Sequence, residues 1–158
     1  MSANELLQRR AAMMQSRGDT TDYKALWVAR LSGTLSGEVI IPAEVTNLVN
    51  NALSSNTGIT SIKTIETQQI GESVIINGTR LALVDLCADT TNIGWHAFYT
   101  NYGSGITLIC RATTPPSISS QSFSNNLVSI QVPAESVAAY KAASNWSNYS
   151  SIITAIQE

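Results

Sequence analysis

The chain has 158 residues, a length typical of one domain that can bury enough apolar surface to fold without a metal or a disulfide. Charged residues make up only 13% of it, and the net charge of −2 argues against a nucleic-acid partner, because phosphate binding needs a basic face. No stretch approaches the roughly 20 apolar residues of a membrane span, and Glu5, Arg9 and Arg10 interrupt any secretion signal, so we expect the protein to stay in the cytoplasm where it is made.

Residues 1–19 are predicted to form an amphipathic helix or anchor. Asn4 is a suitable N-cap, Gly18 is a suitable stop, and the apolar pair Leu6 and Leu7 recurs one heptad later as Met13 and Met14. Because a helix this short is marginal alone in water, it needs a surface to lie against. We expect either a tail or helix packed on its own domain, or a docking or oligomerisation segment with the contact residues Leu6, Leu7, Arg10, Met13 and Met14.

Residues 20–37 are predicted to form an N-terminal cap. Leu26, Val28 and Arg30 alternate along the segment, and the glycine-containing "SGTLSG" follows them. This pattern favours a capping strand or hairpin that leads into the first repeat. A short helix over 22–29 is the alternative.

A pair of mostly apolar residues, two positions apart, recurs at nearly constant intervals through residues 38–133. The pairs are Val39/Ile41, Ile62/Thr64, Val84/Leu86, Leu108/Cys110 and Ile130/Val132. Because the side chains of a strand alternate, both members of each pair face the same side, which we expect to be the core.

The segments between these pairs repeat as well. A second apolar column comprises Leu48, Ile70, Ile93 and Ile118, and a third lies further on at Leu53, Ile75, Phe98 and Phe123. The residues just before the third column are mostly small: Ala52, Val74, Ala97 and Ser122. One such unit cannot bury its own apolar edge, but stacked units can. The sequence predicts an α/β-type repeat solenoid of predominantly short parallel β-strands, a leucine-rich repeat of about 22–24 residues with about five registers.

Residues 134–158 are predicted to form a C-terminal helical cap. "PAESVAAYKAAS" favours a short helix after Pro133. The apolar residues that follow can fold over the last repeat; they are Trp146, Tyr149, Ile152, Ile153 and Ile156. We interpret them as an apolar lid, with an aromatic ligand pocket as the alternative.

Three stretches, "VIIPAEVTNLVNNAL", "LVDLCADTTNIGWHAF" and "LICRATTPPSISSQSF", resemble the phrase "LTxIxIPxxVTxIGxxAF" of the BspA-like bacterial leucine-rich repeat family. The ending "VPAESVAAYKAASNWSNYSSIITAI" resembles the C-terminal ending of that family, and the whole resemblance covers residues 35–158. Thr64 and Ile65 depart from the apolar-Pro pair of the phrase, and the spacing at 87–105 indicates an enlarged loop around "NYGSG". The resemblance implies an interaction module of the surface-adhesin kind.

The leader "MSANELLQRRAAMMQSRG" resembles the short Arg- and Met-bearing leaders of repeat proteins in the structural modules of gut bacteriophages. This resemblance implies a fibre, tail or head-decoration component of a phage particle, located in the virion. The leader would then bind other virion proteins or another copy of the chain.

Catalytic and metal-binding patterns are weak. His96 is the sole histidine, the spacing Cys87-x8-His96-x13-Cys110 is not that of a zinc site, and no glycine-rich phosphate loop is present. Cys110 is predicted to face the core, whereas Cys87 is predicted to be half-exposed. We expect no enzyme, no cofactor and no metal. A minor enzyme that uses His96 and Cys87 is the least favoured alternative.

The outward face of the strand ladder is the remaining candidate site, because repeat proteins offer this surface to partners. The predicted partner face comprises Ile40, Lys63, Leu83, Asp85, Ile109, Arg111 and Gln131. Its partner would be a cell-surface protein or a glycan. Isolated exposed apolar residues are also normal on any protein, so a face without a partner is the alternative. The favoured function is a non-catalytic structural or adhesive phage component, and the alternative is a bacterial protein- or glycan-binding module.

Overall fold

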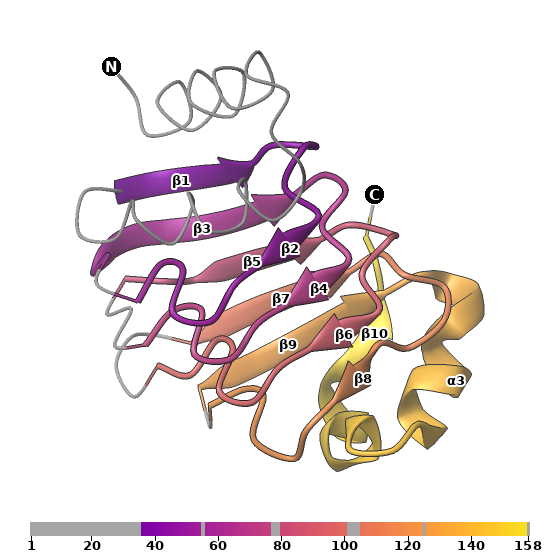
Figure 1. Ribbon diagram of the computed structural model, residues 1–158. Coiled ribbons are helices and arrows are strands. Elements are labelled where there is room, and N and C mark those ends of the chain that lie inside the picture. The colour runs from indigo at the N-terminus through magenta and orange to yellow at the C-terminus, as the bar shows by residue number, and fades with distance from the viewer. Residues whose placement is uncertain (1–35, 55, 77–79, 101–104, 125, 158) are drawn as a thin grey trace.

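The computed structural model describes residues 36–54, 56–76, 80–100, 105–124 and 126–157 (Figure 1). Within these ranges the chain alternates between two sheets of parallel strands, and a few short helices follow near the C-terminus. The predicted helix over 1–19 lies outside the described residues, as does nearly all of the predicted cap over 20–37 and part of the predicted enlarged loop.

The larger sheet has six strands in the order β1-β3-β5-β7-β9-β10, and all neighbours in it are parallel. The strands are β1 (Ser36–Ile41), β3 (Gly58–Thr64), β5 (Leu83–Leu86), β7 (Ile106–Cys110), β9 (Leu127–Val132) and β10 (Ile153–Ala155). The pairing follows the predicted columns: Val39 pairs with Ile62, Ile62 with Val84, Val84 with Leu108, and Leu108 with Ile130. The predicted register of these five strands is confirmed.

The smaller sheet has four two-residue strands in the order β2-β4-β6-β8, and these are also parallel. They are β2 (Asn47–Leu48), β4 (Gln69–Ile70), β6 (Asn92–Ile93) and β8 (Ser117–Ile118). The sequence predicted their apolar residues as a repeated column but did not predict strands there. The second strand forms where the next turn reaches these residues: the Gly71 N–H donates to the Leu48 carbonyl at 2.7 Å, and the Gly94 N–H donates to the Ile70 carbonyl at 2.8 Å.

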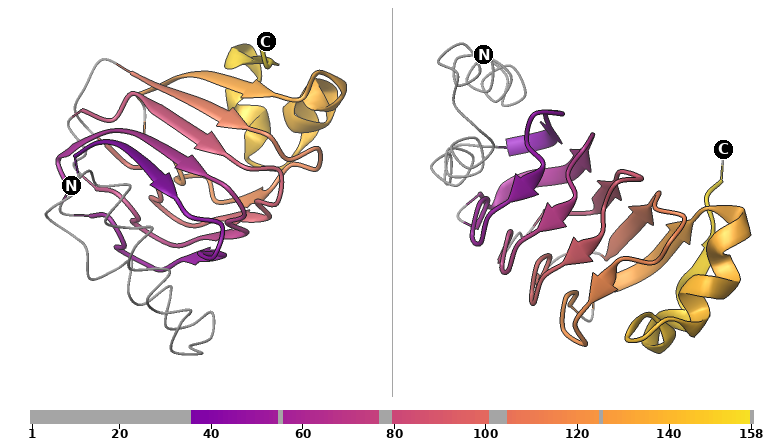
Figure 2. Two further views of the ribbon diagram at one scale, coloured as in Figure 1. Left: turned by 90° about the horizontal axis from the view of Figure 1, so that it is seen from above. Right: turned by 45° about the vertical axis from the view of Figure 1, so that its right-hand side comes forward.

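The core lies between the two layers of strands, which Figure 2 shows from two directions. Both predicted inward columns of the larger sheet are buried, and so are the three columns predicted between the strands. Phe98 and Phe123 illustrate this stacking, since their rings are nearly parallel at a centroid distance of 6.4 Å and their backbones form an isolated parallel bridge. Like residues of successive units therefore pack directly on one another.

The turns after β2, β4 and β6 share a backbone feature that the turn after β8, at Gln121, does not have. Asn51, Ser73 and His96 occupy the same place after the buried residue of β2, β4 and β6, and all three have positive φ angles of 62°, 51° and 53°. A positive φ is uncommon outside glycine, and asparagine tolerates it best. The left-handed backbone at His96 is thus a feature of the repeated turn.

The C-terminal residues cover one end of the two layers (Figure 2). They comprise a 3-10 helix η1 (Ala134–Ser136), the helix α3 (Val137–Ala142), a second 3-10 helix η2 (Trp146–Ile152) and the strand β10. The predicted helix after Pro133 is confirmed. The strand β10 was not predicted. It extends the larger sheet because Ile153 pairs with Ile130, as an equivalent residue of a further unit would.

Candidate functional site

Five residues of the predicted partner face form one row across the larger sheet. Ile40 pairs with Lys63, Lys63 with Asp85, Asp85 with Ile109, and Ile109 with Gln131. Leu83 lies in the adjacent row, at the start of β5, and Arg111 lies directly after the end of β7. Lys63 and Arg111 are exposed, whereas Ile40, Leu83, Ile109 and Gln131 are half-buried. The structure thus places these residues together.

Asp85 is the exception on this face, because it is 8% exposed where an exposed residue was expected. The Arg111 guanidinium covers it through two hydrogen bonds, of 2.7 Å from Nε to Oδ1 and 2.9 Å from Nη2 to Oδ2. The hydrogen bonds to Asp85 raise the pKa of Arg111 above its ordinary value. This bidentate ion pair links β5 to the residue that follows β7, so the Asp85 carboxylate is already paired within the protein.

The two cysteines are both buried free thiols. Cys110 lies in the core as predicted. Cys87 was predicted to be half-exposed, which is wrong: it is 7% exposed, because its backbone N–H donates to Thr64 Oγ1 and its thiol donates to the carbonyl of Thr67. Burial raises the pKa of Cys110, which keeps that thiol protonated and inert.

His96, the other candidate for catalysis, contacts two aromatic rings of its own turn. Its ring stacks on Trp95 at a centroid distance of 3.4 Å and on Tyr99 at 4.1 Å. The rings that contact His96 belong to its own turn, whereas Cys87 is hydrogen-bonded to Thr64 and Thr67 of the preceding unit. Among the described residues, no group of three or more His, Cys, Asp and Glu side chains has the arrangement of a metal site.

The C-terminal aromatic residues fill the end of the core. The Tyr140 hydroxyl donates to the Ala112 carbonyl at 2.7 Å, and Trp146 Nε1 donates to the Pro116 carbonyl at 2.7 Å. The two rings meet edge to face at 4.9 Å. Both side chains are buried and their polar atoms are bonded to the preceding unit, which fits the predicted apolar lid.

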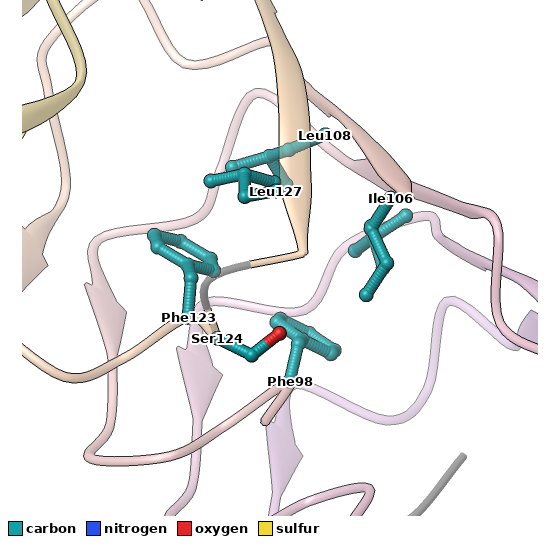
Figure 3. Close-up of a pocket in the computed structure, with 7 residues that line it drawn as sticks. Phe98, Ile106, Leu108, Phe123, Ser124 and Leu127 are labelled. Carbon is teal, nitrogen blue, oxygen red and sulfur yellow. The ribbon is translucent and has the colours of Figure 1, made fainter. Parts of the chain in front are cut away.

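The apolar space between the layers, at the end where β7 and β9 begin, is shown in Figure 3. It is lined mainly by Phe98, Ile106, Leu108, Phe123 and Leu127, and it leaves no room for a water molecule. The Ser124 hydroxyl also lines it and has no hydrogen-bond partner among the described residues. This region is therefore core packing and offers no site for a ligand.

The feature that sequence reasoning missed is Trp95, which is 45% exposed in the turn after β6. Its indole Nε1 donates to Gln121 Oε1 in the next turn at 3.0 Å. The corresponding turn residues of the other units are polar: Asn50, Glu72 and Ser120. A tryptophan at a position that is otherwise polar was the signal in the sequence.

The predicted anchor residues Leu6, Leu7, Arg10, Met13 and Met14 lie outside the described residues. No helix in the described part of the chain is both long enough and apolar enough to cross a membrane. No protein-family model matches the chain, and no curated protein is significantly similar to it in sequence.

Proposed function

We propose that residues 38–133 form a leucine-rich repeat solenoid of the BspA-like kind, closed by a cap over 134–158. Its support is the ladder of parallel pairs, which joins equivalent residues of successive units from β1 to β9. The second ladder, from Leu48 to Ile118, repeats at nearly the same interval. A unit of about 22–24 residues with a short strand at each turn of the chain is typical of leucine-rich repeats.

The function that this architecture supports best is a non-catalytic structural or adhesive one. The observation that carries it is the in-register row from Ile40 to Gln131, which gives the larger sheet a continuous outward surface. Repeat proteins use such extended surfaces to bind partners. The cysteines and the histidine are engaged in core and ring contacts, which favours a scaffold over an enzyme.

More specifically, we propose a fibre, tail or head-decoration component of a bacteriophage particle, anchored by residues 1–19. The support for the particle is the resemblance of the leader to those of phage structural proteins. Mass spectrometry of purified particles, compared with infected-host lysate at equal total protein, tests this. Enrichment of the chain in the particles is the expected result. Abundance in lysate with absence from particles would contradict the proposal.

Anchoring through residues 1–19 is tested by light scattering of the full-length protein beside a chain that starts at Thr20. If the leader assembles the protein, the full-length chain has a defined oligomeric mass and the shortened chain is a folded monomer. Identical masses with both forms present in particles would show that the leader is not needed for assembly.

A bacterial protein- or glycan-binding module of the surface-adhesin kind is the second candidate. The exposed ring of Trp95 favours it, because aromatic rings at a polar surface are common contact residues. Antibody labelling of intact host cells would separate the two candidates. Surface labelling without phage infection supports the adhesin, and labelling only of released particles supports the phage component.

A further inference from the structure

Trp95 stands out among the large apolar residues that the structure describes as exposed. The other two are Ile65 and Val128, which are 45% and 55% exposed. Both are aliphatic side chains, and isolated residues of this kind need no explanation. Trp95 instead forms the outer end of a three-ring stack with His96 and Tyr99. We propose that this indole is a stacking platform for a pyranose ring and that the chain binds a neutral polysaccharide there.

The indole is held in place before any ligand arrives. Its N–H is bonded to Gln121 Oε1, and one ring face lies against His96 with an interplanar angle of 16°. His96 in turn rests on Tyr99, whose backbone N–H donates to the His96 carbonyl at 3.1 Å. A ring fixed in this way loses little conformational freedom on binding, which favours affinity.

The left-handed turn explains how these rings meet. The positive φ of 53° at His96 is shared with the corresponding residues Asn51 and Ser73, so the turn shape comes from the repeat. Only in this unit does the turn carry aromatic residues at 95, 96 and 99. The backbone conformation at 96 is thus shared with two earlier turns, and this unit alone stacks three rings on it, with Trp95 45% exposed.

The outward side chains of the short strands, one of which leads into the Trp95 turn, are uncharged. The outward residues of the smaller sheet form a ladder of amides and a hydroxyl, in which Gln69 Nε2 already donates to Thr91 Oγ1 at 2.9 Å: Asn47, Gln69, Asn92 and Ser117. Side-chain amides both donate and accept hydrogen bonds, as neighbouring sugar hydroxyls do. The carbon-bound hydrogens of a pyranose face can lie on the electron-rich face of an indole. Together these groups match the two kinds of surface that a sugar chain presents.

The charges in this region argue against an anionic ligand. The turns and short strands over 44–54, 66–76, 88–100 and 113–124 contain four acidic residues and no Lys or Arg. Phosphate, sulfate or sialic acid groups would find no cation there. Glu72, an acid, occupies the corresponding position of the preceding turn. A cationic peptide is the competing ligand, and salt separates it from a neutral sugar, because salt weakens exposed charge contacts.

This inference deepens the adhesive role proposed above and rests on it for its biological meaning. Binding is tested on the purified protein alone, by electrophoresis in native gels that contain dextran, yeast mannan, galactomannan or xyloglucan. We expect at least one polysaccharide to slow the wild-type protein at least twofold relative to a gel without it. In a separate equilibrium binding assay, 0.5 M salt should change the affinity for that polysaccharide by less than twofold. Absence from phage particles would then count against the particle and not against the sugar site.

Trp95→Ala should abolish the retardation, and Gln121→Ala should reduce it because the indole loses its hydrogen bond. Ile65→Ala is the matched control, since Ile65 is equally exposed, at 45%, and should leave the retardation unchanged. Unchanged melting of Trp95→Ala would show that the variant is folded, and Trp95→Phe, which keeps an aromatic face, should retain part of the binding. The proposal is overturned if none of the four polysaccharides slows the wild type, if Trp95→Ala is still slowed, or if salt removes the binding.

Discussion

Gly94 lies directly over the backbone of Gly71 in the preceding turn. A Cβ at Gly94 would be 2.7 Å from both the carbonyl carbon and the carbonyl oxygen of Gly71. Gly71 in turn lies over the turn before it, since its Cβ would be 2.6 Å from the carbonyl oxygen of Leu48. Successive turns can approach this closely only because these positions lack side chains.

Replacing Gly94 with Ala should therefore separate two adjacent turns. We expect Gly94→Ala to lower the free energy of unfolding by about 1–3 kcal/mol, the usual cost of forcing an extra carbon into a packed region. Urea denaturation followed by circular dichroism measures it. Ser120→Ala, an exposed change in the next turn, is the control and should lie within about 0.5 kcal/mol of wild type. Equal stabilities of the two variants would contradict the close stacking of turns.

Removing either side chain of the Asp85–Arg111 pair should lower the stability of the protein, but by different amounts. The side chain of Arg111 is 44% exposed and that of Asp85 is 11% exposed. Arg111→Ala leaves a carboxylate shielded from water without its partner, whereas Asp85→Ala leaves a guanidinium that water can solvate. We expect Arg111→Ala to lower the free energy of unfolding by about 1–2 kcal/mol and Asp85→Ala to lower it less, since the pair is partly exposed.

Chemical denaturation of both variants checks this order. Lys63→Ala, in the same row of the sheet, is the control and should change stability by less than about 0.5 kcal/mol. If Asp85→Ala were the more destabilised variant, the pair would not have the burial described here.

Substitution by alanine should have opposite effects on stability at two neighbouring buried serines, Ser122 and Ser124. Within the part of the chain that the structure describes, Ser124 Oγ has no hydrogen-bond partner, whereas Ser122 Oγ donates to the Ile93 carbonyl at 3.1 Å and accepts from the Ser119 N–H at 3.0 Å. Removing an unpaired buried hydroxyl removes its desolvation cost, so Ser124→Ala should raise the free energy of unfolding by about 1 kcal/mol. Ser122→Ala should lower it by about 1–2 kcal/mol, because it leaves a buried carbonyl unpaired.

Thermal melting of the two serine variants side by side is the measurement. A higher melting temperature for Ser124→Ala and a lower one for Ser122→Ala is the expected result. A loss of stability in Ser124→Ala would mean that its hydroxyl has a partner.

Tyr140 predicts a loss of stability in alkali. Burial raises the pKa of Tyr140 above its ordinary value of 10.0, and burial also raises that of Cys110 above 9.0. These groups lose protons more readily in the unfolded chain, so raising the pH favours unfolding. These two groups should not change the free energy of unfolding below about pH 9. That free energy should fall as the pH rises past the ordinary pKa values of Cys110 and Tyr140.

Urea midpoints at pH 8 and pH 10.5 test this, with Tyr140→Phe as the comparison. Tyr140→Phe should be less stable at pH 8 by about 1–2 kcal/mol, because the buried Ala112 carbonyl loses its donor. It should also lose less stability between the two pH values than wild type does. Equal losses in both proteins would show that Tyr140 does not cause the alkaline effect.

The strand register could be predicted from the sequence because each strand repeats its apolar pair at nearly constant spacing. Val39, Ile62, Val84, Leu108 and Ile130 are paired as the alignment indicated. The same spacing continues from Ile130 to Ile153, so β10 was also present in the pattern. It was missed because a helical segment replaces the usual columns between these two residues.

The environment of single side chains was harder to predict than the register. Asp85 and Cys87 are buried by partners that lie far away along the chain in other units, at Arg111, Thr64 and Thr67. Alternation along one strand cannot show such contacts, because it says which way a residue points and not what covers it. Trp95 was missed for a related reason, since its stack depends on the left-handed turn at His96.

The fold and the proposed function both depend on parallel stacking of the repeated units, which backbone NOEs measured by NMR can detect. We expect cross-peaks between Val84 and two partners, Ile62 in the preceding unit and Leu108 in the following one. Cross-peaks that pair Val84 with an antiparallel neighbour, without any to Ile62 or Leu108, would contradict the stacking and the proposed function that depends on it.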